Sequence, residues 1–150
     1  MPKIVVERAI HAPVSLIFDA VANIENLPNT SPDIVSVEFL SETRSGVGTR
    51  FREVRNHKGK EMVTELEVTE HETNRRARMV TDSHGTVWDT TFTTTPAGDD
   101  AVLRIAMDAR GNTVFTRVMN MVMQSVFRRG LEKHIDTVKT YCEGLPSPER

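Results

Sequence analysis

The sequence predicts an α+β domain in which a seven-stranded, curved antiparallel sheet wraps around one long C-terminal helix. One strand-like segment and two short helical segments open the chain. Six more strand-like segments follow, and a helical segment of about thirty residues begins near Val114. An antiparallel sheet with one polar face needs a cover on its other face, and only one long helix is available. A lone helix rarely fills the concave side of such a sheet, so we expect a cavity between them.

The first strand and the two short helices are expected within the first thirty residues. Lys3–Ile10 is rich in β-branched side chains, which is typical of a strand. Pro13 stands where a first-turn proline is tolerated, and apolar residues over 14–21 recur at helical spacing. A second helical piece over residues 24–27 is expected to end at Pro28.

The middle of the chain is predicted to be a meander of antiparallel hairpins. Residues 33–40 have strand character, and residues 47–107 read as strands separated by closely spaced turn signals. The turns are expected at residues 44–48, 57–60, 72–75, 82–85 and 96–100.

The ends of the closing helix mark the end of the domain. Thr113 is expected to cap the helix, because it follows Gly111 and Asn112 and precedes the apolar run. The predicted domain covers residues 1–145, and residues 146–150 form a short flexible tail that contains two prolines.

Composition and charge exclude several functional classes. The net charge is -2, with both signs mixed along 150 residues, so the basic footprint of a nucleic-acid binder is missing. No stretch approaches the roughly 20 apolar residues of a membrane span, and no signal-peptide core follows Met1. The single cysteine, Cys142, excludes an internal disulfide and is typical of a reducing compartment. We therefore expect a cytoplasmic protein with no nucleic-acid partner and no integral membrane segment.

The first half of the closing helix is apolar on nearly every side. An ordinary surface helix has one apolar stripe and one polar face. This helix is therefore expected to be enclosed by the sheet, to line a cavity, or to contact a second subunit. Met119, Met121 and Met123 suit a surface that re-packs around variable shapes. Simple core packing is the alternative.

An inward-facing set of side chains follows from strand alternation and helix spacing. It is apolar with sparse hydroxyls, the usual composition of a pocket for a small hydrophobic molecule, although a solid core needs the same pattern. The predicted ligand-binding residues are Phe51, Thr64, Leu66, Met79, Trp88, Thr90, Phe92, Ile105, Met107, Met119, Val122, Met123, Val126 and Phe127.

Two charged residues, Arg8 and Glu53, also fall on inward faces. Burying either one alone costs several kcal/mol, so each needs a partner, a wet cavity or a position at a rim. No catalytic residue is assigned. Arg8 and Glu53 are the candidates, and the alternative is that both lie near strand ends with their charged groups in solvent. His134 is expected to be a hydrogen-bonded core histidine. No cluster of His, Cys or acidic residues has metal-ligand spacing, so neither a metal nor another cofactor is predicted.

Four segments between residues 3 and 143 carry a family resemblance: ERAIHAPVSLIFDAVANIENLP, SVEFL, GVGTRF and LEKHIDTVKTY. They resemble the START-like (Bet v 1-like, SRPBCC) superfamily and together indicate a bacterial member. This superfamily holds plant pathogenesis-related allergens, polyketide cyclases, and lipid- or quinone-binding proteins. The resemblance implies the helix-grip fold, a hydrophobic-ligand cavity, and gating loops at residues 44–48 and 82–85. Its motifs mark topology and carry no chemistry, so the ligand stays open.

Binding or transport of a small hydrophobic molecule, lipid-, quinone- or polyketide-like, is the leading functional hypothesis. The apolar lining and the lack of a catalytic constellation support it. The alternative is a polyketide aromatase or cyclase that uses the same cavity, in which Arg8 or Glu53 transfers protons. An inward arginine is missing from the expected fourth strand, which argues against the enzyme. The supporting hydroxyls would be Thr64, Thr90 or Tyr141.

A third hypothesis makes the methionine-rich helix a protein-docking element, either in a homodimer or with another partner. Val114, Val118 and Met121 motivate it, because they lie opposite Met123 and Phe127 on the predicted helix. These residues cannot all face one pocket.

Overall fold

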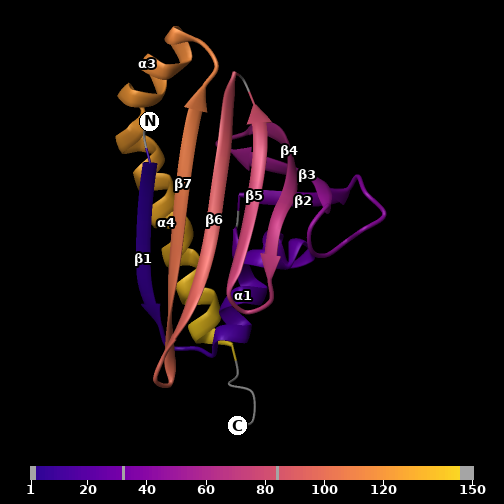
Figure 1. The fold of residues 1–150 in the computed structure, drawn as a ribbon, viewed down its shortest axis with the longest axis vertical. Helices are drawn as coiled ribbons and strands as arrows, with labels where there is room; N and C mark the ends of the chain where they lie inside the picture. Colours follow the sequence, from indigo (N-terminus) through magenta and orange to yellow (C-terminus); the bar gives the residue numbers. More distant parts are fainter. Residues whose placement is uncertain (1–2, 32, 84, 146–150) are drawn as a thin grey trace.

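The computed structural model describes residues 3–31, 33–83 and 85–145. The predicted tail at residues 146–150 and part of the predicted turn at 82–85 lie outside the described residues. One antiparallel sheet has the strand order β1-β7-β6-β5-β4-β3-β2, so each strand from β2 onward pairs with the next one along the chain (Figure 1). The strands are β1 (Lys3–Ile10), β2 (Ile34–Phe39), β3 (Arg50–His57), β4 (Lys60–Glu72), β5 (Arg76–Ser83), β6 (Thr86–Ala97) and β7 (Asp100–Gly111).

The hairpin turns fall where the sequence predicts them. The turns at 57–60, 72–75 and 96–100 join β3 to β4, β4 to β5 and β6 to β7. Between β3 and β4, Lys58 and Gly59 both have positive φ, 52° and 80°. A two-residue turn of this kind matches the right-handed twist of the strands that it joins.

Three short helical segments follow β1. They are α1 (Val14–Ala22), the 3-10 helix η1 (Ile24–Asn26) and α2 (Leu27–Thr30). The expectation that Pro28 ends the second helical piece is wrong, because Pro28 lies in the first turn of α2. A proline is tolerated there since the first amide groups of a helix have no intrahelical acceptor.

The C-terminal region contains two helices where one continuous helix of about thirty residues was expected. Helix α3 (Val114–Val122) and helix α4 (Gln124–Gly144) are separated by Met123, whose ψ is 1°. The two helices rest on different supports, since α3 packs against β7 while α4 packs mainly against β1 and α1. The predicted cap is confirmed, because Thr113 and Thr116 exchange side-chain-to-backbone hydrogen bonds of 3.1 and 3.0 Å.

The core lies between the concave face of the sheet, α1 and α4. Helix α4 buries Leu131, Ile135 and Val138, whose spacing of four and three residues puts them on one face. These side chains meet strand residues such as Leu103 and Ile105. Each fully buried aliphatic side chain contributes about 1.5–3 kcal/mol. The helix-grip arrangement predicted from the sequence is therefore the one observed.

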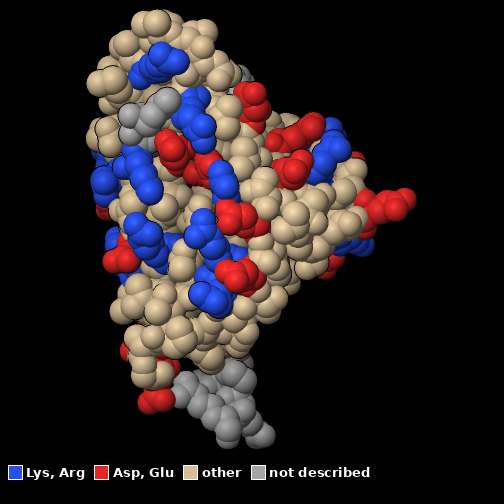
Figure 2. All heavy atoms as spheres, viewed as in Figure 1, with Lys and Arg blue, Asp and Glu red and all other residues tan. Residues whose placement is uncertain are grey.

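The opposite, convex face of the sheet is polar. Figure 2 shows basic and acidic side chains interspersed across it. Arg78 contacts Glu70 at 3.1 Å and also pairs with Asp89, and this guanidinium holds the pKa of Asp89 below its usual value. A face of this kind stays in water, so the sheet needs a cover on one side only. None of the helices in the described part of the chain is long and apolar enough to cross a membrane.

Candidate ligand-binding cavity

A cavity of about 520 Å³ lies between the concave face of the sheet and the first half of α4. Its wall is mostly apolar and comes from six strands and three helices. Eight residues of the predicted ligand-binding set line it, namely Leu66, Met79, Trp88, Thr90, Phe92, Met107, Val126 and Phe127. Pockets of this volume and composition hold small organic molecules.

The other predicted ligand-binding residues lie elsewhere. Phe51 and Ile105 are fully buried in the core, and Thr64 is half-buried on β4 outside the cavity lining. Met119 and Val122 lie exposed on α3, and Met123 is half-buried at the break between the two helices. Because α3 turns away from the cavity, its methionines do not reach it.

An aromatic pair forms part of the wall. The rings of Trp88 on β6 and Phe127 on α4 meet edge to face, with centroids 4.8 Å apart and planes at 86°. This geometry is a favourable one for two aromatic rings. The chain has a single tryptophan, so Trp88 is also a specific reporter of what enters the cavity.

Glu53 and Arg55 place a charged pair in this wall. They are two residues apart on β3 and so share the concave side of the strand. Glu53 is only 6% exposed, and its carboxylate accepts a hydrogen bond of 2.7 Å from Nε of Arg55. The predicted inward-facing residues of this strand end at Glu53 and do not include Arg55. The same period-2 alternation, carried two residues further, selects Arg55 as well.

Ser31 and His134 form a second polar pair in the wall. Oγ of the buried Ser31, just after α2, lies 3.0 Å from Nδ1 of His134 on α4. Burial lowers the pKa of His134 to about 4, and the nearby positive charge of Arg55 adds to this effect. The ring is therefore neutral near pH 7. His134 has the hydrogen bond expected of a core histidine, but it also lines the cavity.

The structure does not bring Arg8 and Glu53 together. Arg8 lies on edge strand β1, and its Nε donates to the Asp136 carboxylate of α4 at 2.8 Å. This contact ties the helix to the sheet edge outside the cavity. Tyr141, a proposed supporting hydroxyl, lies on α4 outside the cavity lining and donates to Oδ1 of Asn26 at 3.3 Å.

The loops expected to gate the cavity pack against other elements. Arg44 in the 44–48 loop lies over the ring of Phe39 at 4.4 Å and contacts Glu25 of η1 at 3.4 Å. Gly85, in the turn between β5 and β6, approaches Thr116 of α3. None of the described residues of these two loops lines the cavity.

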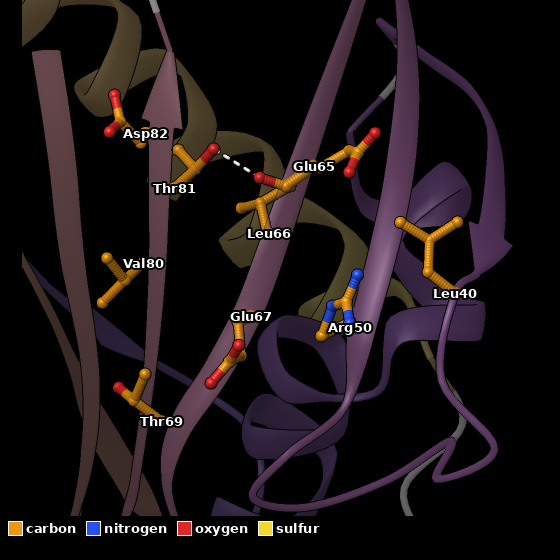
Figure 3. Close-up of a pocket in the computed structure, with 9 residues that line it drawn as sticks. All are labelled: Leu40, Arg50, Glu65, Leu66, Glu67, Thr69, Val80, Thr81 and Asp82. Atoms are coloured by element: carbon orange, nitrogen blue, oxygen red, sulfur yellow. Dashed lines mark hydrogen bonds between the residues drawn. The ribbon is translucent and has the colours of Figure 1, made fainter.

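A smaller hollow of about 320 Å³ opens where β4 and β5 diverge (Figure 3). The strand pairing runs from Glu67 and Val80 to Glu72 and Arg76. On the other side of the Glu67–Val80 pair, the Thr81 hydroxyl donates to the backbone carbonyl of Glu65. Leu66 lines both this hollow and the cavity. The hollow is more polar than the cavity, since Arg50, Glu65, Glu67 and Asp82 surround it, and it lacks an aromatic wall.

No group of three or more His, Cys, Asp or Glu side chains in the described ranges is arranged to hold a metal ion. The side chains that line the cavity offer apolar contact, hydrogen-bonding groups and the Glu53–Arg55 ion pair.

Comparison with known proteins identifies the family. The sequence model described as polyketide cyclase / dehydrase and lipid transport matches residues 1–143. The chain belongs to this family. The resemblance to the START-like superfamily noted in the sequence is thereby confirmed. No curated protein matches the chain.

Solved structures of other proteins share the fold of this chain. A START superfamily protein from Mycobacterium smegmatis has a TM-score of 0.70 at 16% identity, over 95% of this chain and 94% of that chain. The di-domain ARO/CYC BexL from the BE-7585A biosynthetic pathway has a TM-score of 0.80 at 16% identity, over 95% of this chain and 47% of that chain. Norcoclaurine synthase from Thalictrum flavum, in complex with dopamine and hydroxybenzaldehyde, has a TM-score of 0.73 at 14% identity, over 98% of this chain and 89% of that chain. At such identities the likeness shows the shared fold.

Proposed function

We propose that the protein binds a small hydrophobic molecule, lipid-, quinone- or polyketide-like, in the cavity between the sheet and α4. The observation that carries this proposal is an apolar wall around about 520 Å³ that includes the Trp88–Phe127 pair. A ligand there gains about 25 cal/mol for each Å² of apolar surface that it removes from water. The family's description, which includes lipid transport, supports the proposal.

Native mass spectrometry of the protein purified from its host, followed by organic extraction, tests this proposal. We expect a stoichiometric adduct of a few hundred daltons, on the order of a drug-sized ligand for this volume. A Gly130→Phe variant should lose the adduct, because Gly130 lines the cavity and a Cβ there meets open space. Gly144→Phe is the matched control, since Gly144 lies at the end of α4 and also has open space around its Cβ. An adduct that survives Gly130→Phe would contradict binding in this cavity.

A second candidate is polyketide aromatase or cyclase chemistry in the same cavity. The buried Glu53 carboxylate, held by Arg55 against an apolar wall, favours it, because such enzymes need a few groups that transfer protons or polarise oxygen. With a linear poly-β-ketone as substrate, Glu53→Gln should abolish turnover while binding persists. Arg8→Ala is the matched control, because Arg8 lies outside the cavity and its loss should leave turnover unchanged. If the wild-type protein leaves the poly-β-ketone unchanged, the proposed aromatase or cyclase activity is contradicted.

We also propose that the apolar face of α3 is buried against a second copy of the chain. Val114 and Phe115 are 74% and 73% exposed, and Met121 and Val122 lie beside them on the surface. Apolar side chains gathered in this way on one short helix favour an association surface over a solvated face.

A further inference from the structure

One part of the cavity wall is polar, and its chemistry restricts which ligands fit. We call Ser31, Glu53, Arg55 and His134 the polar corner; all four line the cavity, and the rest of its wall is largely apolar. The inference drawn from it rests on the proposed function, because it names the head group of the hydrophobic molecule proposed above.

Charge is balanced around the polar corner. Glu53 is neutralised by Arg55 at 2.7 Å. Asp33 and Lys133 also line the cavity and add one charge of each sign. The lining as a whole therefore has no net charge to offset an ionised carboxylate or ammonium group on a ligand. Removing an unpaired charge from water costs several kcal/mol, so ionised head groups are disfavoured.

The His134 ring offers a neutral hydrogen-bonding group. Its Nδ1 faces Oγ of Ser31, whereas its Nε2 has no hydrogen-bond partner among the residues that the structure describes. When the Ser31 hydroxyl donates to Nδ1, a neutral imidazole carries its proton on Nε2. Ser31 thus orients the ring, and in this arrangement Nε2 is the donor.

We propose that the cavity selects a hydrophobic molecule bearing one uncharged oxygen head group, a phenol or a ketone, whose oxygen accepts a hydrogen bond from Nε2 of His134. The apolar body lies against the aromatic wall formed by Trp88 and Phe127. Glu53 and Arg55 keep the corner polar without giving it a net charge. His134 is the specificity-determining residue, and Ser31 positions it.

Four naphthalene probes of nearly equal size test the proposal by isothermal titration calorimetry at pH 7. They are naphthalene, 2-naphthol, 2-acetonaphthone and 2-naphthoic acid, which is ionised at this pH. The naphthol and the ketone should bind about tenfold more tightly than naphthalene, the effect of one net hydrogen bond. Naphthoate should bind no more tightly than naphthalene.

Variants of the polar corner test whether its residues cause the tighter binding of the naphthol and the ketone. His134→Phe should remove the preference for the naphthol and the ketone while naphthalene still binds. His134→Gln retains a donor and should preserve part of the preference, and Ser31→Ala should weaken it about two- to threefold because the ring loses its orienting partner. His11→Phe is the matched control, since this histidine is exposed and lies outside the cavity.

The outcomes separate this inference from the proposed function. Equal binding of all probes, or a preference that survives His134→Phe, would overturn the inference and leave cavity binding intact. Tightest binding of naphthoate would also overturn it, since the corner would then be an anion site. If no probe binds, naphthalene included, the proposed function itself is contradicted and the inference with it.

Discussion

The two C-terminal helices use their apolar residues in opposite ways. Helix α4 turns its apolar face inward, where Leu131, Ile135 and Val138 are buried in the core. Helix α3 turns its apolar face outward. Its one buried residue is Asn120, which is 6% exposed and whose Nδ2 donates to Thr86 of β6 at 3.2 Å. Figure 2 shows the end of the molecule that holds α3 as largely uncharged surface.

The attachment of α3 explains this inversion. Arg117 Nε donates to the carbonyl of Gly111 at 3.2 Å. A Cβ at Gly111 would stand 2.6 Å from the Arg117 backbone nitrogen, so the absence of a side chain lets the helix approach the end of β7 closely. The helix is thus held by polar contacts on its polar face. The comparison teaches that amphipathicity identifies the apolar face of a helix but not the face that the fold buries.

The largest expected difference between the helices is in stability. Ile135→Ala in α4 should lower the free energy of unfolding by about 2–5 kcal/mol, because it leaves a cavity in the core. Val122→Ala in α3 should change the free energy of unfolding of the monomer by less than about 0.5 kcal/mol, because that side chain is exposed there. Urea denaturation followed by circular dichroism measures both. Equal losses would contradict the outward orientation of α3.

The inward side of α4 should also make stability depend on pH. The pKa of His134 is about 4 in the folded protein and 6.5 when unperturbed, so the unfolded chain binds more protons between these values. The free energy of unfolding is therefore highest above about pH 6.5 and falls as the pH drops toward 4, by about 3 kcal/mol in all.

His134→Gln should remove this part of the pH dependence. The charged groups that line the cavity with His134, namely Glu53 and Arg55 of β3, Asp33 before β2 and Lys133 of α4, stay in place in the variant. Urea unfolding of both proteins at pH 7, 6 and 5 gives the difference. Parallel curves for the two proteins would show that His134 is not buried in its neutral form.

A matched pair of phenylalanines sharpens the comparison for ligand binding. Phe127→Ala should weaken naphthalene binding about five- to tenfold, because it removes a cavity wall and the edge contact with Trp88. Phe115→Ala on α3 should leave the affinity unchanged, since that ring is exposed outside the cavity. Calorimetry measures both. Equal weakening would place the binding site elsewhere.

The smallest effect on stability is expected for Met121→Glu. This exposed side chain should tolerate the charge within about 0.5 kcal/mol, while association through α3 is lost. Size-exclusion chromatography with light scattering measures the mass. A wild-type monomer contradicts the homodimer, and an unfolded variant contradicts the exposure of Met121.

Much of the cavity wall could be predicted because side chains alternate along most of each strand, apart from irregularities in β2 and β4. Period-2 patterning put Leu66, Met79, Trp88 and Phe92 on one face, and the same rule applied one step further would have included Arg55. The helical spacing also placed His134 on the face of α4 that includes Phe127 and Leu131. Ser31 could not be found in this way, because it follows a short helix and carries no periodic signal.

The sequence by itself determined the order of the strands, the turns and the antiparallel meander, because these depend on local spacing and on turn residues. The family followed from four segments that resemble the START-like superfamily. Only the tertiary structure decided that the closing helix breaks at Met123, that the apolar face of α3 is exposed, and that Ser31, Glu53, Arg55 and His134 meet in one corner. Those features depend on contacts between segments that are distant along the chain, such as the 103-residue separation of Ser31 and His134. Local periodicity carries no information about such contacts, since it specifies which residues share a face and not what that face meets.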